Sequence, residues 1–185
     1  MKHKFMHAFG LVVLGSVGFA MSPADAVTTA NGSYYATPSW DQQLPASTRF
    51  VVLSNWNSEA VLDRETGLVW ATTPLALRVS WSDALFECRT VVIGNRRGWR
   101  VPSQEELSTL LDPTQSAPAL PAGHPFQGIG ATEAFWTATT WENDPSQAYP
   151  VSFDSAFGNG TVNKTLVLLR FWCVRGGSSV SNPPY

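Results

Sequence analysis

The sequence predicts a mixed α+β domain in which two short helices are set among several short strands and long loops. Apolar residues recur at helical spacing in two stretches, residues 80–92 and 103–111. Elsewhere they form short runs separated by Gly, Pro, Asn and Asp, which is typical of strands and turns. Eight tryptophans and a charged content of only 14% indicate an aromatic core rather than a disordered chain.

The first 26 residues have the pattern of a secretory signal peptide. Lys2 and Lys4 precede an apolar run over residues 8–21, and cleavage is expected after the small-x-small sequence 24–26. A retained anchor is the alternative, but the run is shorter than the roughly 20 residues that a membrane-spanning helix needs. We therefore expect a mature protein of residues 27–185, secreted or periplasmic and without a membrane span.

The mature chain is expected to contain one main domain, residues 59–177. Before it, residues 27–58 predict a polar lead-in and a first strand, "RFVVLS" (49–54). The domain itself opens with "VLDRETGLVWA", which predicts two short strands around a turn bracketed by Asp63 and Gly67. The Ser-, Asn- and Pro-rich residues 178–185 are expected to form a flexible tail.

The first predicted helix is "SWSDALFECRTVV" (80–92), with Ser80 as its capping residue and Asp83 reaching back. One buried face is expected to hold Trp81, Ala84, Leu85 and Cys88, at the spacing i, i+3, i+4 and i+7. Cys88 should therefore face the core.

The second predicted helix follows "GNRRGWRVPSQEEL" (94–107) and covers about residues 104–111. Ser103 and Glu106 have the spacing of a capping box, and Asp112-Pro113 should end the helix. Arg100 is expected to form a structural ion pair, for which Glu105, Glu106 and Asp112 are the available carboxylates.

The rest of the chain predicts a long loop followed by strands. Residues 113–131 form the loop, "AFWTATTW" (134–141) and "AYPVSFD" (148–154) are strands, and "FGNGTVN" (157–163) is a turn. The apolar run "TLVLLRFWCVR" (165–175) predicts a single strand buried on both faces. Its residues Phe171, Trp172 and Val174 are interpreted as core rather than as an aromatic binding surface.

The two cysteines, Cys88 and Cys173, predict a disulfide, since an even count in an exported protein is typical of one. Closing so long a loop should stabilise the fold by about 2–4 kcal/mol. A metal pair and a catalytic thiol are the alternatives. Both are disfavoured because the mature chain offers a single histidine, His124, as a further zinc ligand or as a base.

The charge of the chain argues against nucleic acid as a partner. Removing Lys2, Lys4 and Asp25 with the signal peptide moves the formal net charge from −2 to −3. A protein that binds nucleic acid generally carries a basic surface that neutralises phosphates.

Five motifs resemble those of an exported bacterial family, the Lcl C-terminal domain, which is named for a collagen-like adhesin. They are "TGLVW" (66–70), "SWSDALFEC" (80–88), "GWRVPSQEEL" (98–107), "FWTATTW" (135–141) and "RFWCVRGG" (170–177). The resemblance covers about residues 59–177 and departs mildly where Val101 replaces the usual Leu and "WTAT" replaces "WSST". It implies a C-type-lectin-like α+β fold, similar also to formylglycine-generating enzymes, with a small twisted antiparallel sheet, and it supports pairing Cys88 with Cys173.

Candidate ligand-binding residues lie in two places. Arg96 and Arg97 could bind sulfate or carboxylate through their planar guanidinium groups, although exposed arginines are most often only solvated. In "WEND", Trp141 could stack on a sugar ring, and Asn143 and Asp144 are oxygen ligands of the kind that calcium takes. A turn capped by Asn or Asp is the alternative for that stretch, so no cofactor is expected and calcium stays a minor option.

The function that these features favour is an exported, non-catalytic recognition or adhesion module for a glycan or a cell-surface protein. The best-described relative in the family is an adhesin domain implicated in binding sulfated polysaccharides. The expected contact loops are 113–131 and 141–162, because loops on a braced scaffold commonly carry binding residues. A structural or assembly subunit of a cell-envelope complex is the alternative. A glycan-active hydrolase is less favoured, because Glu105 and Glu106 are better explained as helix-start residues than as a catalytic pair.

Overall fold

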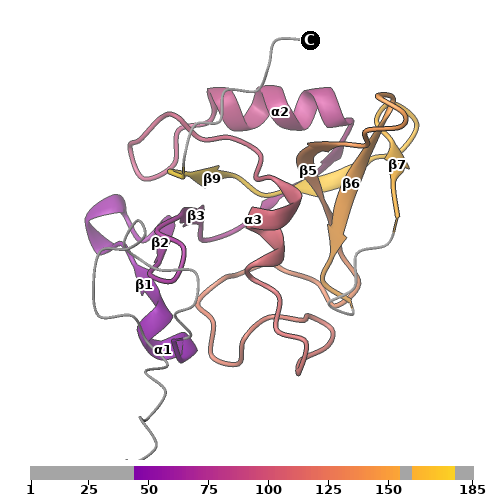
Figure 1. Cartoon of the computed structure of the whole chain (residues 1–185). Coiled ribbons are helices and arrows are strands. Elements are labelled where there is room, and N and C mark those ends of the chain that lie inside the picture. The colour runs from indigo at the N-terminus through magenta and orange to yellow at the C-terminus, as the bar shows by residue number, and fades with distance from the viewer. Residues whose placement is uncertain (1–43, 155–159, 178–185) are drawn as a thin grey trace, which may run out of the picture. The chain divides into compact units, whose positions relative to one another are not determined.

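The computed structural model describes residues 44–154 and 160–177, which form an α+β domain with two small sheets. The first sheet has the strand order β1-β2-β3-β9, and the second has the order β4-β8-β5-β6-β7 (Figure 1). The predicted signal peptide, most of the lead-in and the tail after residue 177 lie outside the described residues. The α+β class with few short helices is confirmed. In place of the one small antiparallel sheet that the resemblance implied there are two small sheets, and the second is mixed because β5 pairs with β8 in parallel.

The first sheet is built from the start of the domain and its last strand. A short helix, α1 (Ala46–Arg49), leads into β1 (Phe50–Val52), and a 3-10 turn, η1 (Ser54–Trp56), leads to β2 (Ala60–Asp63). The predicted pair of strands around the "DRETG" turn is confirmed as β2 and β3 (Val69–Ala71), paired with Val61 opposite Trp70. The final strand, β9 (Val174–Arg175), completes the sheet beside β3. Helix α1 was not predicted, because it lies mostly within the segment that was expected to be a polar lead-in.

The second sheet is built around β5 (Ala134–Thr140). β6 (Gln147–Ser152) pairs with it in antiparallel fashion and β8 (Leu169–Phe171) in parallel, so both predicted strands, 134–141 and 148–154, are confirmed. Two further strands were not predicted. β4 (Leu75–Val79) forms one edge beside β8, and β7 (Val162–Asn163) forms the other beside β6, within the segment predicted as a turn.

Both predicted helices exist, and each begins at the predicted cap. α2 (Trp81–Thr90) starts after Ser80, whose hydroxyl accepts a hydrogen bond from the Asp83 backbone N–H. The Asp83 carboxylate accepts from the Ser80 hydroxyl at 2.6 Å, rather than from its backbone N–H as a full capping box would have it. α2 packs against β5 and β8, and Figure 1 shows it next to β5. Ala84 and Cys88 of this helix are fully buried.

The second helix, α3 (Gln104–Ser108), has the complete capping box between Ser103 and Glu106. It ends three residues before the predicted stop at 111. The backbone N–H of Thr109 is shared among three preceding carbonyls, and the Thr109 carbonyl accepts a hydrogen bond from Arg49 instead of continuing the helix. The loop from residue 109 to residue 133 contains no helix or strand, as expected for 113–131.

The last apolar run is not one strand, as its composition predicted. It divides into β8 in the second sheet and β9 in the first, and the connecting residues Trp172 and Cys173 belong to neither. The residues before β8 are largely exposed, with Leu166 at 82% and Leu168 at 54%. Phe171 through Val174 are completely buried, so the interpretation of these residues as core is confirmed.

Trp172 is the centre of the aromatic core. Its ring lies 4.8–6.0 Å from four others, mostly in edge-on or tilted contact, and these belong to Trp70, Phe126, Phe135 and Phe153. Its indole N–H donates to the Ala71 carbonyl at 2.7 Å. Edge-to-face aromatic pairs stabilise a core beyond the area that they bury, so this one side chain joins β3, β5, the residue that follows β6 and the long loop.

The predicted disulfide is present between Cys88 on α2 and Cys173, with a Cα–Cα separation of 5.5 Å. Both residues are fully buried. The bond ties α2 to the segment that crosses between the two sheets.

Among the described residues, no helix combines the length and the apolar character needed to cross a membrane.

The disulfide generates the first prediction. The C88A/C173A double variant should unfold with a free energy about 2–4 kcal/mol below that of the oxidised wild type, because the reduced chain regains the entropy of an open loop. Chemical denaturation measures the difference. A reductant should lower wild-type stability by a similar amount and leave the double variant unchanged; equal sensitivity of the two proteins would contradict a stabilising bond.

Candidate binding site

The predicted ligand-binding residues lie at opposite ends of α2, roughly 15 Å apart along its axis. Arg97 donates from its guanidinium to the carbonyl of Thr90 at the C-terminal end of the helix. The turn carrying Trp141 and Asp144 is joined by Lys164 to Trp81 at the N-terminal end. The two sets therefore form separate surfaces rather than one site.

At the N-terminal end of α2, Asp144 organises the turn between β5 and β6. Its carboxylate accepts from the Ser146 backbone N–H and hydroxyl, at 2.9 and 2.7 Å, and from the Gln147 amide at 2.9 Å. The Gln147 and Ser146 hydrogen bonds lower the pKa of Asp144. These contacts match the alternative given above, a turn capped by Asp, while Asn143 is exposed.

The surroundings of this turn are aromatic and internally bonded. Lys164 donates to the Thr140 hydroxyl and the Pro145 carbonyl, both at 2.8 Å, and lies 4.0 Å above the Trp81 ring. Burial lowers the pKa of this lysine. Trp141 is half-buried, and its side chain has no hydrogen-bond partner among the described residues. Lys164 therefore acts as an internal brace, and the half-buried Trp141 and the exposed Asn143 remain available for an outside contact.

At the C-terminal end of α2, two arginines lie against one tryptophan. The guanidinium carbons of Arg96 and Arg175 are 5.2 and 5.4 Å from the centroid of the Trp56 ring. Cation–π contact of this kind is worth about 0.5–1 kcal/mol at exposed positions. We call Trp56, Arg96 and Arg175 the arginine–tryptophan cluster; it joins η1, the loop after α2, and β9.

Neither arginine of the cluster has an ion-pair partner among residues 44–154 and 160–177. The nearby carboxylate of Glu59 is used by the backbone N–H of Gly94, which donates to it at 2.6 Å. Arg97, beside the cluster, is exposed and donates to the Thr90 carbonyl. Within the described part of the chain, the cluster therefore presents positive charge that no carboxylate neutralises.

The loop that carries Arg96 is fixed by close packing of Gly94 and Trp99 against Trp56. A Cβ atom on Gly94 would lie 2.7 Å from the Trp56 Cβ, and Gly94 has a φ of 59°, so only glycine fits. Trp99 is buried, donates its indole N–H to the Arg96 carbonyl at 2.9 Å, and contacts the Trp56 ring edge-on at 6.4 Å. These contacts fix the backbone on which Arg96 stands.

A hollow of about 430 Å³ adjoins the cluster, and we call it the β9 hollow. It is lined by Val69, Gly98, Arg100, Arg175, Gly176 and Gly177. Three of these residues are glycines, which have no side chain to fill the space, so the hollow beside Arg175 stays open.

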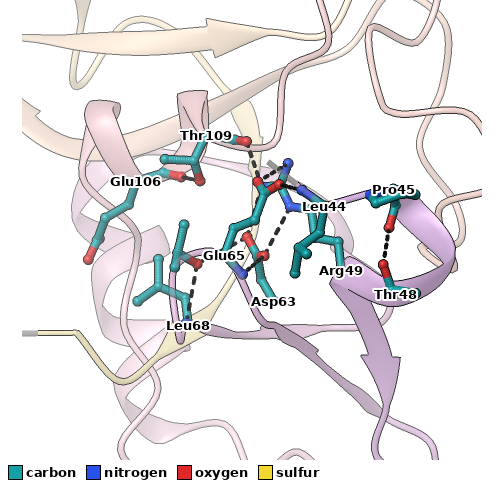
Figure 2. A network of polar contacts seen from close by, with 10 residues as sticks. Leu44, Pro45, Thr48, Arg49, Asp63, Glu65, Leu68, Glu106 and Thr109 are labelled. Carbon is teal, nitrogen blue, oxygen red and sulfur yellow. Dashed lines mark hydrogen bonds and ion pairs between the residues drawn. The ribbon is translucent and has the colours of Figure 1, made fainter. Parts of the chain in front are cut away.

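Three other arginines, in contrast, are fully used inside the fold. Arg49 donates two hydrogen bonds of 2.9 Å to Asp63, pairs with Glu65 at 2.8 Å, and donates to the Thr109 carbonyl (Figure 2). Arg170 is paired with Glu133 and donates to three backbone carbonyls. Arg100 is paired with Glu106, which confirms the structural role expected for it.

A second hollow, of about 660 Å³, lies above the Arg49 network. Its polar side is formed by Arg49, Glu65 and Asp112, and its remaining walls come largely from proline, alanine and leucine side chains. Pro113, Pro121 and Ala122 of the predicted contact loop 113–131 line it. Because Arg49 is paired with two carboxylates, Asp63 and Glu65, its positive charge is already compensated within the protein.

His124, the one histidine beyond the predicted signal peptide, lies in that same loop. Its ring stacks on Phe126 at 5.9 Å, and its Nδ1 is buried without a hydrogen-bond partner in the described structure. Burial lowers the pKa of His124 below 6.5. Among the described residues, no three His, Cys, Asp or Glu side chains, His124 included, lie close enough together to hold a metal ion.

Sequence reasoning found Arg96 but missed Trp56 and Arg175. Trp56 precedes the matched motifs, and Arg175 sits in the run interpreted as buried core. The available signal was the "RGG" ending, where an arginine followed by two glycines marks the exit from the core.

The fold is thus a disulfide-braced α+β domain with a cationic surface at one end of α2. The family model described as the Lcl C-terminal domain matches residues 59–175, well over half of the chain, and the protein belongs to this family. No curated protein matches the sequence. The family and the disulfide are consistent with an exported protein, and the two-sheet architecture is consistent with the expected C-type-lectin-like fold.

The Arg49 network generates a prediction about stability. Arg49→Ala should lower the free energy of unfolding by about 3–5 kcal/mol, because it leaves the fully buried carboxylate of Asp63 without its partner. The neighbouring exposed Arg64 is the matched control, and Arg64→Ala should cost no more than about 0.5 kcal/mol. Urea denaturation compares the two, and equal losses would refute the structural role of the buried pair.

His124 generates a prediction about pH. Between its lowered pKa and the ordinary value of 6.5, the folded protein binds fewer protons than the unfolded chain. The free energy of unfolding should therefore fall as the pH decreases below about 6.5. Denaturation curves at several pH values should show a shallower fall for His124→Gln than for the wild type; parallel curves would show that this histidine is not responsible.

Proposed function

We propose that the protein is an exported, non-catalytic recognition module that binds an anionic glycan at the arginine–tryptophan cluster. The observation that carries the proposal is the placing of Arg96 and Arg175 against Trp56 without a carboxylate partner in the described chain. Arg49 and Arg170, the arginines that the described part of the chain buries, both have such partners. Two guanidinium groups held near one ring repel each other, and a bound oxyanion would relieve that repulsion.

The chemistry of the cluster suits sulfate and carboxylate groups. A guanidinium presents a planar fork of N–H donors that matches both groups. The half-buried indole of Trp56 is the common contact of both guanidinium groups and so keeps the two cations on one surface. The family resemblance supports the same choice, because the adhesin domain of this family is implicated in binding sulfated polysaccharides.

A glycan on the surface of a cell or in the envelope would reach this site without opening the fold. Arg96 and Arg97 are exposed, and Trp56 and Arg175 are half-buried. Because the net charge of the whole chain is −2, an anionic glycan would be attracted by a local cluster of positive charge rather than by the protein as a whole. Binding should therefore be local and sensitive to salt, since ions screen exposed charges over about 10 Å at 0.1 M.

The second function weighed above, a structural or assembly subunit of a cell-envelope complex, would use apolar rather than cationic surface. The strongly exposed apolar side chains Leu77, Phe86 and Leu166 are the contacts available for it. They come from β4, α2 and the segment before β8, and singly exposed apolar residues are common on soluble domains. We therefore place this function second.

Binding to immobilised heparin tests the proposal. The R96A/R175A variant should bind about tenfold more weakly or worse, because hydrogen bonds to charged groups contribute about 1.5–3 kcal/mol each. The matched control is R64A/R78A, which removes the same charge from two exposed arginines, one in the turn after β2 and one on β4. It should change the affinity less than twofold, as expected for charges outside the contact surface.

Two outcomes would contradict this assignment. Equal losses in both variants would show attraction by net charge alone. A loss of binding in Trp141→Ala, with R96A/R175A unaffected, would move the site to the turn between β5 and β6. Desulfated heparin and polygalacturonate separate recognition of sulfate from recognition of carboxylate.

A further inference from the structure

The position of Arg175 depends on Arg100, which lies on the neighbouring segment. The backbones of Arg100 and Val174 exchange two hydrogen bonds, at 2.9 and 2.8 Å, just before Arg175. The Arg100 guanidinium donates to the Gly176 carbonyl at 2.8 Å, just after it. Arg175 is therefore bracketed by contacts to a single residue, while its own backbone pairs with Val69 on the other side.

The positive charge of Arg100 is compensated by an ion pair with Glu106. Its two terminal nitrogens each donate to a different oxygen of Glu106, both at 2.6 Å. Glu106 in turn accepts a hydrogen bond of 2.9 Å from the backbone N–H of Ser103, the N-terminal capping residue of α3. A bidentate pair of this kind is geometrically specific, so it fixes the guanidinium of Arg100 against the start of α3.

The chain closes over this ion pair after β9. A Cβ atom on Gly177 would lie 3.0 Å from Nη2 of Arg100 and 3.0 Å from Oε1 of Glu106, and Gly177 has a φ of 79°. A side chain there would push against both partners. The "RGG" ending therefore fits around Arg100, and the β9 hollow lies beside it.

We propose that Arg100 is a positioning residue for the binding site: its ion pair with Glu106 and its bond to Gly176 hold Arg175 beside Trp56. Arg100 itself makes no contact with the ligand. The proposal rests on the proposed function for its effect on binding, whereas the placing of Arg175 is a property of the free protein. These two parts can be tested separately.

The binding part is tested by a double-mutant cycle on full-length exported protein, with heparin as the probe. Arg100→Gln should weaken binding about fivefold in the wild-type and R96A backgrounds, since neighbouring residues commonly couple to this extent. In the R175A background it should cause no further loss, because no side chain is left to position. The same loss in all three backgrounds would overturn the proposal.

Glu106→Gln separates positioning from direct contact. If Arg100 touched the anion, removing the charge of its partner would free the guanidinium and tighten binding to heparin. We expect no gain, because Arg100 acts through Arg175, and a tighter complex would refute the assignment. If Arg100→Gln does not fold, Arg100→Lys serves instead: lysine reaches Glu106 but cannot also hold the Gly176 carbonyl, so the same dependence on Arg175 is expected.

The structural part needs no ligand. In protein with isotope-labelled arginine, the Arg175 side-chain signals should carry a ring-current shift from Trp56, and Arg100→Gln should move them toward values for a free arginine. Arg78→Ala should leave them in place. Unchanged Arg175 signals in Arg100→Gln would overturn the positioning role even if heparin binds. Absent heparin binding with displaced Arg175 signals would instead refute the proposed function alone.

Discussion

The buried passage from Phe171 to Val174 is the constraint on which the rest of this structure depends. In four residues the chain leaves the second sheet and enters the first, and no atom of these side chains is open to solvent. Trp172 fills the space between the sheets with four aromatic neighbours, and Cys173 binds α2 covalently. Because both sheets and α2 meet at this passage, their relative positions are set by packing around one segment rather than by a continuous sheet.

Electrostatics distinguishes two sets of arginines in the domain. Those that lie in the interior are paired with carboxylates and bonded to backbone carbonyls, since a buried charge without a partner costs several kcal/mol. Those of the arginine–tryptophan cluster stand at the surface with an indole ring as their neighbour. Arg100 links the groups: it is paired like an interior residue, yet it holds the backbone on either side of Arg175. The rigid core thus ends at the edge of the candidate site.

Local signals predicted the local structure well. Ser80 and Ser103 mark the starts of α2 and α3 because capping depends on a few neighbouring atoms, and the turn at Asp63 follows from its own short sequence. The run 165–175 was misinterpreted because an apolar segment carries no information about which sheet each half joins. β4 was missed for a related reason. Its central residues are exposed on an edge, so burial does not impose an alternating pattern on it.

The sequence by itself determined the α+β class, the two capped helices, the cysteine pair and the membership of the Lcl C-terminal domain family, because each depends on residue type and on short-range spacing. Tertiary structure alone decided that Arg96 and Arg175, 79 positions apart, share one tryptophan. It also decided that the predicted ligand residues separate to opposite ends of α2. Such proximity results from the crossing of the chain at Trp172 and Cys173, and long-range packing of this kind leaves no periodic trace along the sequence.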